Sequence, residues 1–531
     1  MTTAPRDTEA TPAAPSIAAP PDRRLTEAIA ELEQLLGAAR VSQGDADRLT
    51  YSRDMWPRTL LAVRDGVPAV APPDLVVWPA STSEVSAVVR IARRHRLPIV
   101  PYGAGSGVCG GAMATRGGII VDLKRMDRVL EVVTADHLVH AECGIIGQLF
   151  EEQLNRRGMT LGHFPSSIYC STLGGWLAAR SAGQLSSLYG KIEDMVERIE
   201  VVLGDGRVVE LSRDQMPDLG ALMVGSEGTL GVITRAWMRV RPLRDFRIFR
   251  AYRFPRVAAG CEAMRRIMQR ELRPAVTRLY DEMDTLMARP SKHDRPDESS
   301  LLGGAGALLG GVDADVQRSV VRAALSRAGM LSKVAESLLP RISSGCLMVL
   351  GFEGDRALTE VEAALAHAEA LAAGGEDLGQ GPGLHWWDRR YAVSYKMSPM
   401  FAAGALVDTM EIATTWDRLL ELYDEVRKAL SRDAVVLAHF SHAYAEGCSI
   451  YFTFAAAAKD RASSEALYDE LWRRGLDATT RVGATISHHH GVGLSKAAFM
   501  SREHGEALSV YRQAKHALDP DGVLNPGKMG L

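Results

Sequence analysis

The apolar residues in the first part of the chain follow two different periods. They fall at helical spacing from Leu25 to Leu36, and again from Val85 to Ala92 behind a possible capping serine at Ser81 or Ser83. Short continuous apolar runs instead predict buried strands, and a helix follows the last of them. The predicted strands are 74–79, 97–100, 119–123, 129–133 and 138–143, and the helix is 146–157.

A hairpin and a further strand complete this unit. Apolar runs at 200–203 and 207–211 flank the sequence Gly-Asp-Gly, which is a strong hairpin signal, and another run at 233–240 ends before a proline. The pattern therefore predicts a first domain of α+β type at residues 66–243. A helical segment at 23–65 precedes it.

Beyond residue 244 the helical patterns become longer and alternate with strands. The segment 289–311 is rich in Gly, Pro, Ser and charge, so it is either a surface loop or part of a contact with a partner. We predict a second α+β domain at 244–485 and a C-terminal segment at 486–531. The predicted elements here are helices at 255–272, 313–327 and 357–372 and strands at 347–352 and 448–454.

Length and charge limit the possible classes. A chain of 531 residues is too long for one core, so two or three domains are expected. The net charge is −3 and no long basic block occurs, which argues against a nucleic-acid partner. No apolar run reaches the length of a transmembrane helix. Residues 1–22 lack the basic head and apolar core of a secretory signal, so we predict a disordered tail.

The six cysteines show no paired spacing. There is no C-x-x-C pair, which is typical of a protein in a reducing compartment and argues against both a disulfide framework and a thiolate zinc site. The six positions are Cys109, Cys143, Cys170, Cys261, Cys346 and Cys448.

The densest glycine cluster directly follows the strand at 97–100. Five glycines occupy the eleven positions from Pro101 to Gly111, and this density suits close approach of backbone N–H groups to a phosphate or pyrophosphate. The spacing is G-x-G-x-G, and later glycines interrupt any helix, so it is not the helix-opening dinucleotide fingerprint. Taken alone, the cluster also fits a simple glycine-rich turn.

Two more segments have a similar composition, rich in glycine and small residues. Residues 162–176 mix glycine with small hydroxyl side chains, and residues 225–233 place glycines at a turn that runs into a strand. Each is also consistent with a structural loop. Because three such segments occur in one domain, a shared extended ligand is the simpler interpretation.

A fourth cluster lies near the C-terminus, in the sequence Ser487 to Gly493. It contains three adjacent histidines, of which His488 and His490 would share a face on a strand unless the backbone turns. Proton transfer suits imidazoles, which titrate near neutral pH. A zinc site and a solvated histidine turn remain open alternatives.

Together these motifs resemble the flavoprotein family that shares the FAD domain of vanillyl-alcohol oxidase and of D-lactate and glycolate dehydrogenases. The resemblance covers residues 50–531 and rests on PYGAGSG, GHFPSS, STLGGW, YGKIEDMV, GSEGTLGVIT and SHHHGVG in that order. It implies a two-lobed vanillyl-alcohol-oxidase-type FAD-binding domain at 66–243, with an α+β cap domain over the flavin at 244–485. The segment 486–531 would return to the flavin site.

The resemblance also implies where FAD would bind. The glycine cluster would hold the pyrophosphate, 166–172 and 178–181 the ring and ribityl chain, and 227–233 the adenosine side. No histidine lies in the glycine cluster, so we predict noncovalent FAD. The implied residues are Pro101, Tyr102, Gly103, Ala104, Gly105, Ser106, Gly107, Ser166, Ser167, Ser171, Thr172, Gly174, Ala178, Ala179, Arg180, Ser181, Glu227, Gly228, Thr229, Leu230, Gly231, Val232 and Ile233.

Within the family the cap distinguishes two groups. The 2-hydroxyacid dehydrogenases carry a G-H-x-G-D-G-N-x-H metal motif and a later E-H-G, whereas here Tyr451 replaces the last histidine and His489 the glutamate. A metal site would thus lose two ligands, and we predict none. Tyr451 and the three histidines instead resemble the alkylglycerone-phosphate synthases, also called alkyldihydroxyacetonephosphate synthases.

That resemblance implies the candidate active-site residues. Tyr451 would be the active-site tyrosine, His488, His489 and His490 the proton-handling cluster, and His163 and Thr409 pocket residues. One departure concerns an arginine that contacts the acidic head group in that family. Its position falls on Met397 with Lys396 beside it, and methionine cannot pair with an anion. Either Lys396, Arg389 or Arg390 substitutes, or the substrate is less anionic.

The implied reaction uses FAD without net redox. The acyl group of an acyl-dihydroxyacetone phosphate is exchanged for a fatty alcohol, as in ether-lipid synthesis. The alternative is an FAD-linked oxidase or dehydrogenase of a hydroxy acid or alcohol. We predict a small-molecule or lipid-like substrate, a cytoplasmic protein with possible peripheral membrane association, and a homodimer.

Overall fold

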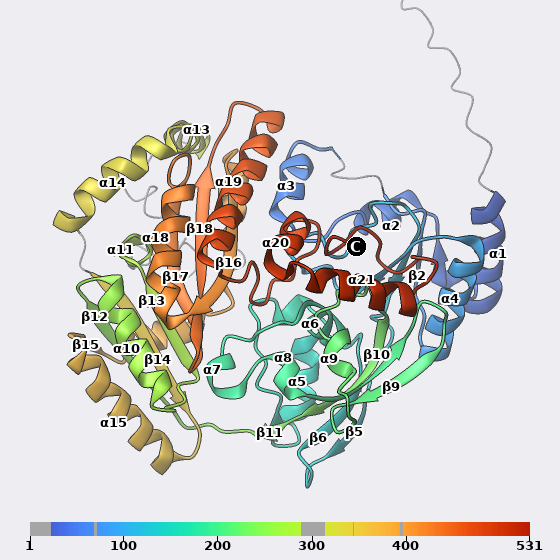
Figure 1. Ribbon diagram of the computed structural model, residues 1–531, viewed down its shortest axis with the longest axis horizontal. Coiled ribbons are helices and arrows are strands. Elements are labelled where there is room, and N and C mark those ends of the chain that lie inside the picture. Colours follow the sequence, from blue (N-terminus) through green and yellow to red (C-terminus); the bar gives the residue numbers. More distant parts are fainter. Residues whose placement is uncertain (1–22, 68–71, 288–313, 343–344, 393–396) are drawn as a thin grey trace, which may run out of the picture.

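The computed structural model describes residues 23–67, 72–287, 314–342, 345–392 and 397–531. Figure 1 shows two halves: the blue and green residues of the first part of the chain form one, and the yellow and orange residues of the second part form the other. The red C-terminal helices return to the first half. The predicted tail, the segment 289–311 and Lys396 lie outside the described residues.

The first lobe is built on a four-stranded sheet with the order β1-β2-β4-β3. The last three strands pair in parallel, and β1 pairs antiparallel to β2. Helices α1 (Arg23–Leu36) and α4 (Thr82–His95) pack against one face. The strands are β1 (Val41–Ser42), β2 (Leu75–Val77), β3 (Ile99–Tyr102) and β4 (Ile119–Asp122), and two short helices, α2 (Asp45–Thr50) and α3 (Pro57–Arg64), lie nearby in the chain.

Helix α4 shows how the sequence sets local structure. The Ser81 side chain accepts a hydrogen bond from the N–H of Glu84 at 3.3 Å, as expected of an N-cap, and Arg96 in the left-handed region ends the helix. Val85, Val88 and Val89 lie on its buried face. The predicted helix and its cap are therefore confirmed.

The second lobe is a five-stranded antiparallel sheet with the order β5-β6-β10-β8-β9. The predicted hairpin is confirmed, since β8 and β9 pair across a turn in which Gly206 has φ 83°. The strands are β5 (Val129–Val133), β6 (Leu138–Glu142), β8 (Val196–Val202), β9 (Val208–Ser212) and β10 (Val232–Arg239). Around them lie α5 (Gly147–Asn155), α6 (Leu173–Ala179), α7 (Ser186–Tyr189), α8 (Ile192–Met195), α9 (Gly220–Met223) and the short pair β7 (Met159–Thr160) and β11 (Arg241–Pro242).

The cap is organised by a seven-stranded antiparallel sheet with the order β15-β12-β14-β13-β17-β18-β16. Its strands are β12 (Arg247–Phe254), β13 (Val276–Tyr280), β14 (Cys346–Glu353), β15 (Glu376–Gly379), β16 (Leu406–Thr415), β17 (Val435–Ala443) and β18 (Gly447–Ala456). Its helices are α10 (Val257–Gln269), α11 (Glu282–Met287), α13 (Ala314–Leu325), α14 (Ala328–Ile342), α15 (Arg356–Ala372), α16 (Gly381–Arg389), α17 (Ser398–Ala402), α18 (Leu419–Leu430) and α19 (Arg461–Val482).

The two faces of this sheet differ in character because side chains alternate along a strand. On β18, Ile450, Phe452 and Phe454 belong to the core under the helices, whereas Tyr451 and Thr453 line a cavity on the other face. The neighbouring strand β17 alternates in the same way. The cap sheet therefore presents an apolar face to its own helices and a polar face to the cavity.

The C-terminal segment ties the two halves together. After α20 (Met500–His504) and α21 (Ala507–Leu518), Leu524 forms a parallel bridge with Ile99 at the edge of the first sheet. The side chain of Lys528, fully buried, donates to the carbonyl of Met113 at 2.7 Å. Segments from both chain ends thus close around the loop that follows β3.

Several sequence expectations are corrected or extended by the structure. The predicted helical segment 23–65 contains the helices α1, α2 and α3 together with the short strand β1. Five of the seven cap strands and several cap helices had no clear sequence signal; the five strands are β12, β13, β15, β16 and β17. All six cysteines are unpaired. Within the described residues, no helix has the length and apolar character needed to cross a membrane.

Candidate active site

A cavity of about 1140 Å³ lies between the first half of the chain and the polar face of the cap sheet. The glycine cluster and the two other small-residue segments form one wall. From the predicted cofactor residues this wall contains Pro101, Tyr102, Gly103, Ala104, Gly105, Ser106, Gly107, Ser166, Ser167, Ser171, Thr172, Gly174, Ala178, Ala179, Ser181, Glu227, Gly228, Gly231, Val232 and Ile233. The structure therefore brings the three segments together around one space.

The glycine cluster has no room for side chains. A Cβ atom at Gly103 would lie 2.4 Å from the Thr172 hydroxyl, and one at Gly105, where φ is 65°, would overlap the Tyr102 hydroxyl. No hydrogen bond of the described chain is donated by the N–H groups of Ala104 and Ser106. The loop thus offers backbone donors to the cavity at close approach.

The cap wall places polar side chains from neighbouring strands side by side. His439 and Ser441 alternate with buried apolar residues on β17, and a bulge after Ser441 turns His442, with φ 53°, toward the same cavity. Tyr451 of β18 pairs with His439, and their rings stack with centroids 4.7 Å apart. Thr409 of β16, a predicted pocket residue, also lines the cavity.

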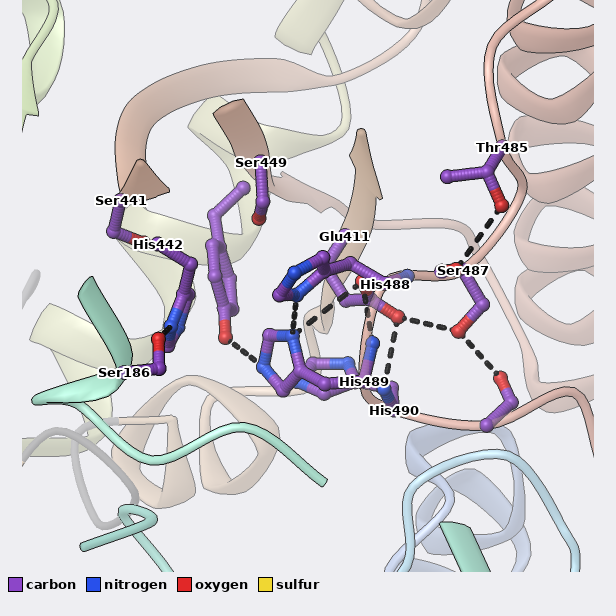
Figure 2. Close-up of polar contacts among 12 residues, drawn as sticks. Ser186, Glu411, Ser441, His442, Ser449, Thr485, Ser487, His488, His489 and His490 are labelled. Carbon is purple, nitrogen blue, oxygen red and sulfur yellow. Dashed lines mark hydrogen bonds and ion pairs between the residues drawn. The ribbon is translucent and has the colours of Figure 1, made fainter. Parts of the chain in front are cut away.

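The three adjacent histidines lie on a turning loop, and a buried carboxylate explains its shape. Glu411 of β16 accepts hydrogen bonds from the backbone N–H groups of His488 at 2.6 Å, His489 at 3.3 Å and His490 at 3.0 Å (Figure 2). It also accepts from the Lys496 ammonium at 3.0 Å. Because the backbone curls around Glu411, the strand geometry considered for these histidines does not apply.

A second carboxylate anchors the end of this loop. Glu227 accepts hydrogen bonds from the N–H groups of Val492 and Gly493, the latter at 2.8 Å. We predicted Glu227 as a cofactor residue, and its side chain is instead engaged with the histidine loop while the residue borders the cavity. Glu227 therefore connects the glycine-lined wall of the cavity to the histidine loop.

Hydrogen bonds link the tyrosine to two of the histidines. The Tyr451 hydroxyl contacts His489 Nε2, and His489 Nδ1 lies 2.9 Å from His488 Nδ1 (Figure 2). Burial lowers the pKa of His489 well below its ordinary value and the pKa values of His488 and His490 to about 4. Burial raises the pKa of Tyr451. At neutral pH the cluster is therefore an uncharged chain of donors and acceptors.

The same cluster includes three potential metal ligands within 4.8 Å of one another, in Glu411, His488 and His489. Both Glu411 oxygens, however, already accept hydrogen bonds from three N–H groups, the Ser487 hydroxyl and Lys496. A carboxylate offers about four lone-pair sites, so none is left for an ion. The geometry favours a hydrogen-bonded anchor over a metal centre.

Positive charge reaches the cavity from β13. Arg278 lies on the cavity wall and donates to His439 Nε2 at 2.5 Å, and its guanidinium lies over the Tyr280 ring at 5.5 Å. Arg389 and Arg390, both considered as substitutes, also line the cavity, but Arg390 stacks on Trp387 at 3.7 Å. Sequence reasoning missed Arg278 because the pattern around it did not predict a strand.

Met397 borders the cavity at the start of α17 and packs against the cap core. The position at which the resemblance implies an arginine is therefore occupied by an uncharged side chain. The neighbouring Lys396 lies outside the described residues.

Some predicted residues lie away from the cavity. His163 is 1% exposed and packs on Trp176, with its Nε2 3.2 Å from the Ser181 hydroxyl, so it belongs to the core behind the wall. This placement corrects the expectation that it contacts substrate. Arg180 pairs with Glu193, and Thr229 and Leu230 are fully buried. His488 does not line the cavity, but it contacts His489, which does.

Two segments of the chain match known protein families. Residues 73–212 match the FAD binding domain family, and residues 246–529 match the family of FAD linked oxidases, C-terminal domain. The chain belongs to the FAD-linked oxidase family. The alkyldihydroxyacetonephosphate synthase of Trypanosoma brucei brucei is 30% identical over 515 residues, which cover 94% of this chain and 80% of that protein. An uncharacterized FAD-linked oxidoreductase of Escherichia coli, YgcU, is 25% identical over 513 residues, or 94% and 96% of the two chains.

Solved structures support the same family. An alkyldihydroxyacetonephosphate synthase superposes with a TM-score of 0.74 at 26% identity, covering 96% of this chain and 87% of the other. p-Cresol methylhydroxylase superposes with a TM-score of 0.70 at 16% identity over 96% and 97% of the two chains, which shows the fold. The predicted α+β fold class, family and FAD cofactor are confirmed. The protein is therefore an FAD-dependent enzyme.

The residues present fit this cofactor. The glycine wall would meet the pyrophosphate with backbone donors, and the cavity exceeds the size typical of a single small ligand. Three cysteines border it, the buried Cys109 and Cys143 and the exposed Cys170. Burial raises the pKa of all three thiols, which disfavours the thiolate needed for a covalent bond. Noncovalent attachment stays our prediction.

Proposed function

We propose that the protein exchanges the acyl group of an acyl-dihydroxyacetone phosphate for a fatty alcohol. The observation that carries the proposal is the hydrogen-bonded set of Tyr451 and His489 at the cavity wall, fixed by Glu411. The 30% identical synthase of Trypanosoma brucei brucei, which covers nearly the whole chain, supports the same assignment.

The proton-handling step is assigned to this set. An exchange at the ester carbon requires a proton to leave that carbon and later to return, so the site needs a base that is uncharged at rest. Burial keeps His489 neutral, and the contact with Tyr451 places a hydroxyl beside its Nε2. When bound, FAD supplies a ring that accepts an electron pair from the substrate carbon.

The substrate chains would occupy the apolar part of the cavity. An exchange of one long-chain group for another needs a wall that holds either chain without hydrogen bonds. Such side chains line the cavity from both halves of the molecule, namely Leu60, Leu286, Leu347, Val349, Phe401 and Leu437. This composition supports a lipid-like substrate.

The head group requires a cation, and Arg278 is the residue we assign to it. It lies on the cavity wall next to His439 and Tyr451, where a phosphate on the substrate would be close to the reacting carbon. Its Nε atom is buried with no hydrogen-bond partner in the described part of the chain, so a donor is available. Arg278 would thus compensate for Met397.

The second candidate is an FAD-linked oxidoreductase of a hydroxy acid or alcohol. Met397 favours it, because a substrate with a smaller or absent anionic group needs no cation at that position. The relative YgcU of Escherichia coli is named as an FAD-linked oxidoreductase.

Anaerobic mixing separates the two candidates. The purified holoenzyme is mixed without oxygen with D-lactate, glycolate or a long-chain alcohol, and the flavin absorbance near its visible maximum is followed. The proposal predicts no lasting bleaching with any of them, and exchange products only when an acyl-dihydroxyacetone phosphate and a fatty alcohol are both present. Stoichiometric bleaching by one hydroxy acid or alcohol alone would establish the oxidoreductase instead.

A further inference from the structure

Both candidate reactions release a proton inside a closed site. Exchange of an ester for an alcohol yields an ether, a carboxylate and one H⁺. Oxidation of an alcohol passes a hydride to the acceptor and leaves the hydroxyl H⁺ behind. The side chain of His489 is only 8% exposed. The proton therefore needs a route from the Tyr451 side of the cavity to solvent.

The two histidines beside Tyr451 form the first part of such a route. A neutral imidazole carries one proton. Because His489 Nε2 accepts the hydrogen bond from Tyr451, the proton of His489 is on Nδ1. That Nδ1 is 2.9 Å from His488 Nδ1, which must then accept, and the His488 proton lies on Nε2. A proton that enters at His489 Nε2 thus releases another at His488 Nε2.

The far end of the route is open. His488 Nε2 is buried and has no hydrogen-bond partner within the described residues. The His488 ring lies beside the Tyr444 ring, with centroids 5.6 Å apart, and the Lys191 ammonium lies 5.8 Å from the centroid of the same tyrosine ring. The segment that contains Lys191 therefore lies near His488, and the charges of Lys191 and Glu193 both act on its pKa.

That segment carries a carboxylate with an unused oxygen. Glu193 Oε1 is paired with the Lys191 ammonium at 2.8 Å and with Arg180 Nε at 2.9 Å. Its Oε2 atom is buried and lacks a partner in the described part of the chain, although 18% of the side chain is exposed. Glu193 consequently combines a buried, unpaired acceptor oxygen with a side chain that is partly exposed to solvent.

We propose that Glu193 Oε2 receives, through one bridging water molecule, the proton that leaves His488 Nε2, and passes it to solvent. The proposal rests on the proposed function only in that the reaction releases a proton at Tyr451. The step is balanced: one H⁺ leaves the Tyr451 side and one H⁺ reaches water. Each imidazole ends neutral with its proton on the opposite ring nitrogen, so both tautomers must be reset before the next turnover.

Other groups that face His488 are less suited to accept. Both Glu411 oxygens are occupied by five donors, and His442 uses its Nδ1 for the Ser186 hydroxyl at 2.8 Å (Figure 2). Lys191 and Arg180 are cations and do not accept. Burial lowers the pKa of His488 to about 4. Burial raises the pKa of Glu193, but Lys191 and Arg180 lower it by more, so the pKa of Glu193 lies below its ordinary value. Neither group would retain the proton, which suits transfer rather than storage.

The test compares Glu193→Gln with Glu210→Gln, which removes a carboxylate of β9 that is paired with Arg198, is 50% exposed and does not belong to the histidine loop. With saturating substrate we expect Glu193→Gln to lower turnover by about tenfold or more with KM and flavin absorbance unchanged, and to raise the solvent deuterium isotope effect. Added formate should restore turnover in proportion to its concentration. The Glu210→Gln enzyme should match the wild type.

Wild-type turnover in Glu193→Gln, or a loss that neither formate nor deuterium oxide alters, would overturn the relay. A second readout does not require activity. In the holoenzyme with ¹⁵N-labelled histidine, His488 should carry its proton on Nε2, and Glu193→Gln should lower its pKa because the Glu193 charge raises it. A His488 proton on Nδ1 would contradict the relay. A wild-type enzyme that turns over neither candidate substrate would contradict the proposed function alone.

Discussion

Glu411 and His488 are joined by a 2.6 Å hydrogen bond from the histidine N–H to the buried carboxylate. The same carboxylate binds the next two N–H groups of the loop and the Lys496 ammonium, whose side chain is also fully buried. Burial opposes ionisation of Glu411, but Lys496 and the neighbouring histidines bring its pKa down to about 2. One anion from the cap sheet therefore fixes the orientation of the whole histidine cluster.

Replacement of this anion should impair catalysis and also lower stability, because the fully buried Lys496 ammonium loses its charged partner. We expect Glu411→Gln to lower kcat by about 100-fold, because a misplaced His489 no longer contacts Tyr451. FAD content should stay near that of the wild type. Steady-state kinetics and the flavin to protein absorbance ratio measure this. Glu446→Gln, an exposed carboxylate on the neighbouring turn, is the matched control. Equal kcat in the two variants would show that Glu411 is not needed to position His489.

Tyr451 should be needed for turnover and not for cofactor binding. Its hydroxyl contacts His489 at the cap wall, opposite the glycine cluster. We expect Tyr451→Phe, and likewise His489→Ala, to lower turnover by about 100-fold or more. The bound FAD and the thermal midpoint should change little. Turnover assays on FAD-loaded enzyme decide this, and full activity in both variants would refute the assignment of these residues.

Arg278 should determine the affinity for an anionic substrate. A lost charge-assisted hydrogen bond costs about 1.5–3 kcal/mol, so Arg278→Gln should raise KM for a phosphate-bearing substrate by about tenfold or more. The KM for the uncharged alcohol should change much less. Arg389→Gln serves as the comparison, because Arg389 lines the same cavity. An identical rise for both substrates would show loss of structure instead of loss of a head-group contact.

Met397 should limit head-group binding. We expect Met397→Arg to increase kcat/KM for an acyl-dihydroxyacetone phosphate, because it adds a cation at the cavity border. Met397→Leu keeps the apolar character and should leave kcat/KM unchanged. Steady-state kinetics with both variants test this. A decrease in kcat/KM for Met397→Arg would show that Arg278 alone suffices and that a second cation is unfavourable.

The acid limit of activity should lie well below that of an ordinary histidine. Burial holds the pKa values of His488 and His490 near 4, so both imidazoles stay neutral as the pH falls through 6.5. Activity should therefore persist to about pH 5 and fall toward pH 4. Because the Glu411 charge raises both pKa values, Glu411→Gln should shift the residual profile to lower pH. A wild-type acid limb centred near pH 6.5 would contradict the neutral cluster.

The flavin-side wall was predictable from sequence, and the cap wall was largely not. Glycine density alone indicates close backbone approach, and the packing at Gly103 and Gly105 follows from it. Glu411 gave no such signal: an acidic residue in a strand is usually exposed, and its role depends on a loop 77 positions away. Strand β13 breaks the alternation that predicts strands, so Arg278 was hidden with it.

The histidine cluster was likewise predictable from the sequence in part only. The chemistry of three adjacent imidazoles pointed to proton transfer, but their orientation depends on a turn that two distant carboxylates impose. The bulge that directs His442 into the cavity also has no local sequence signature. Residue types were therefore informative about chemistry, and tertiary contacts decided which side chains meet.

The central claim is tested most directly by following the product of a single incubation. The holoenzyme is supplied with an acyl-dihydroxyacetone phosphate and a radiolabelled long-chain alcohol. Label that stays in the phosphate-bearing product after alkaline hydrolysis is measured, apart from the free alcohol, with Tyr451→Phe in parallel. The account predicts base-stable ether product and an equal amount of free fatty acid from the wild type, with about 100-fold less from the variant. Absence of ether product, together with net reduction of the flavin by a hydroxy acid or alcohol, would contradict it.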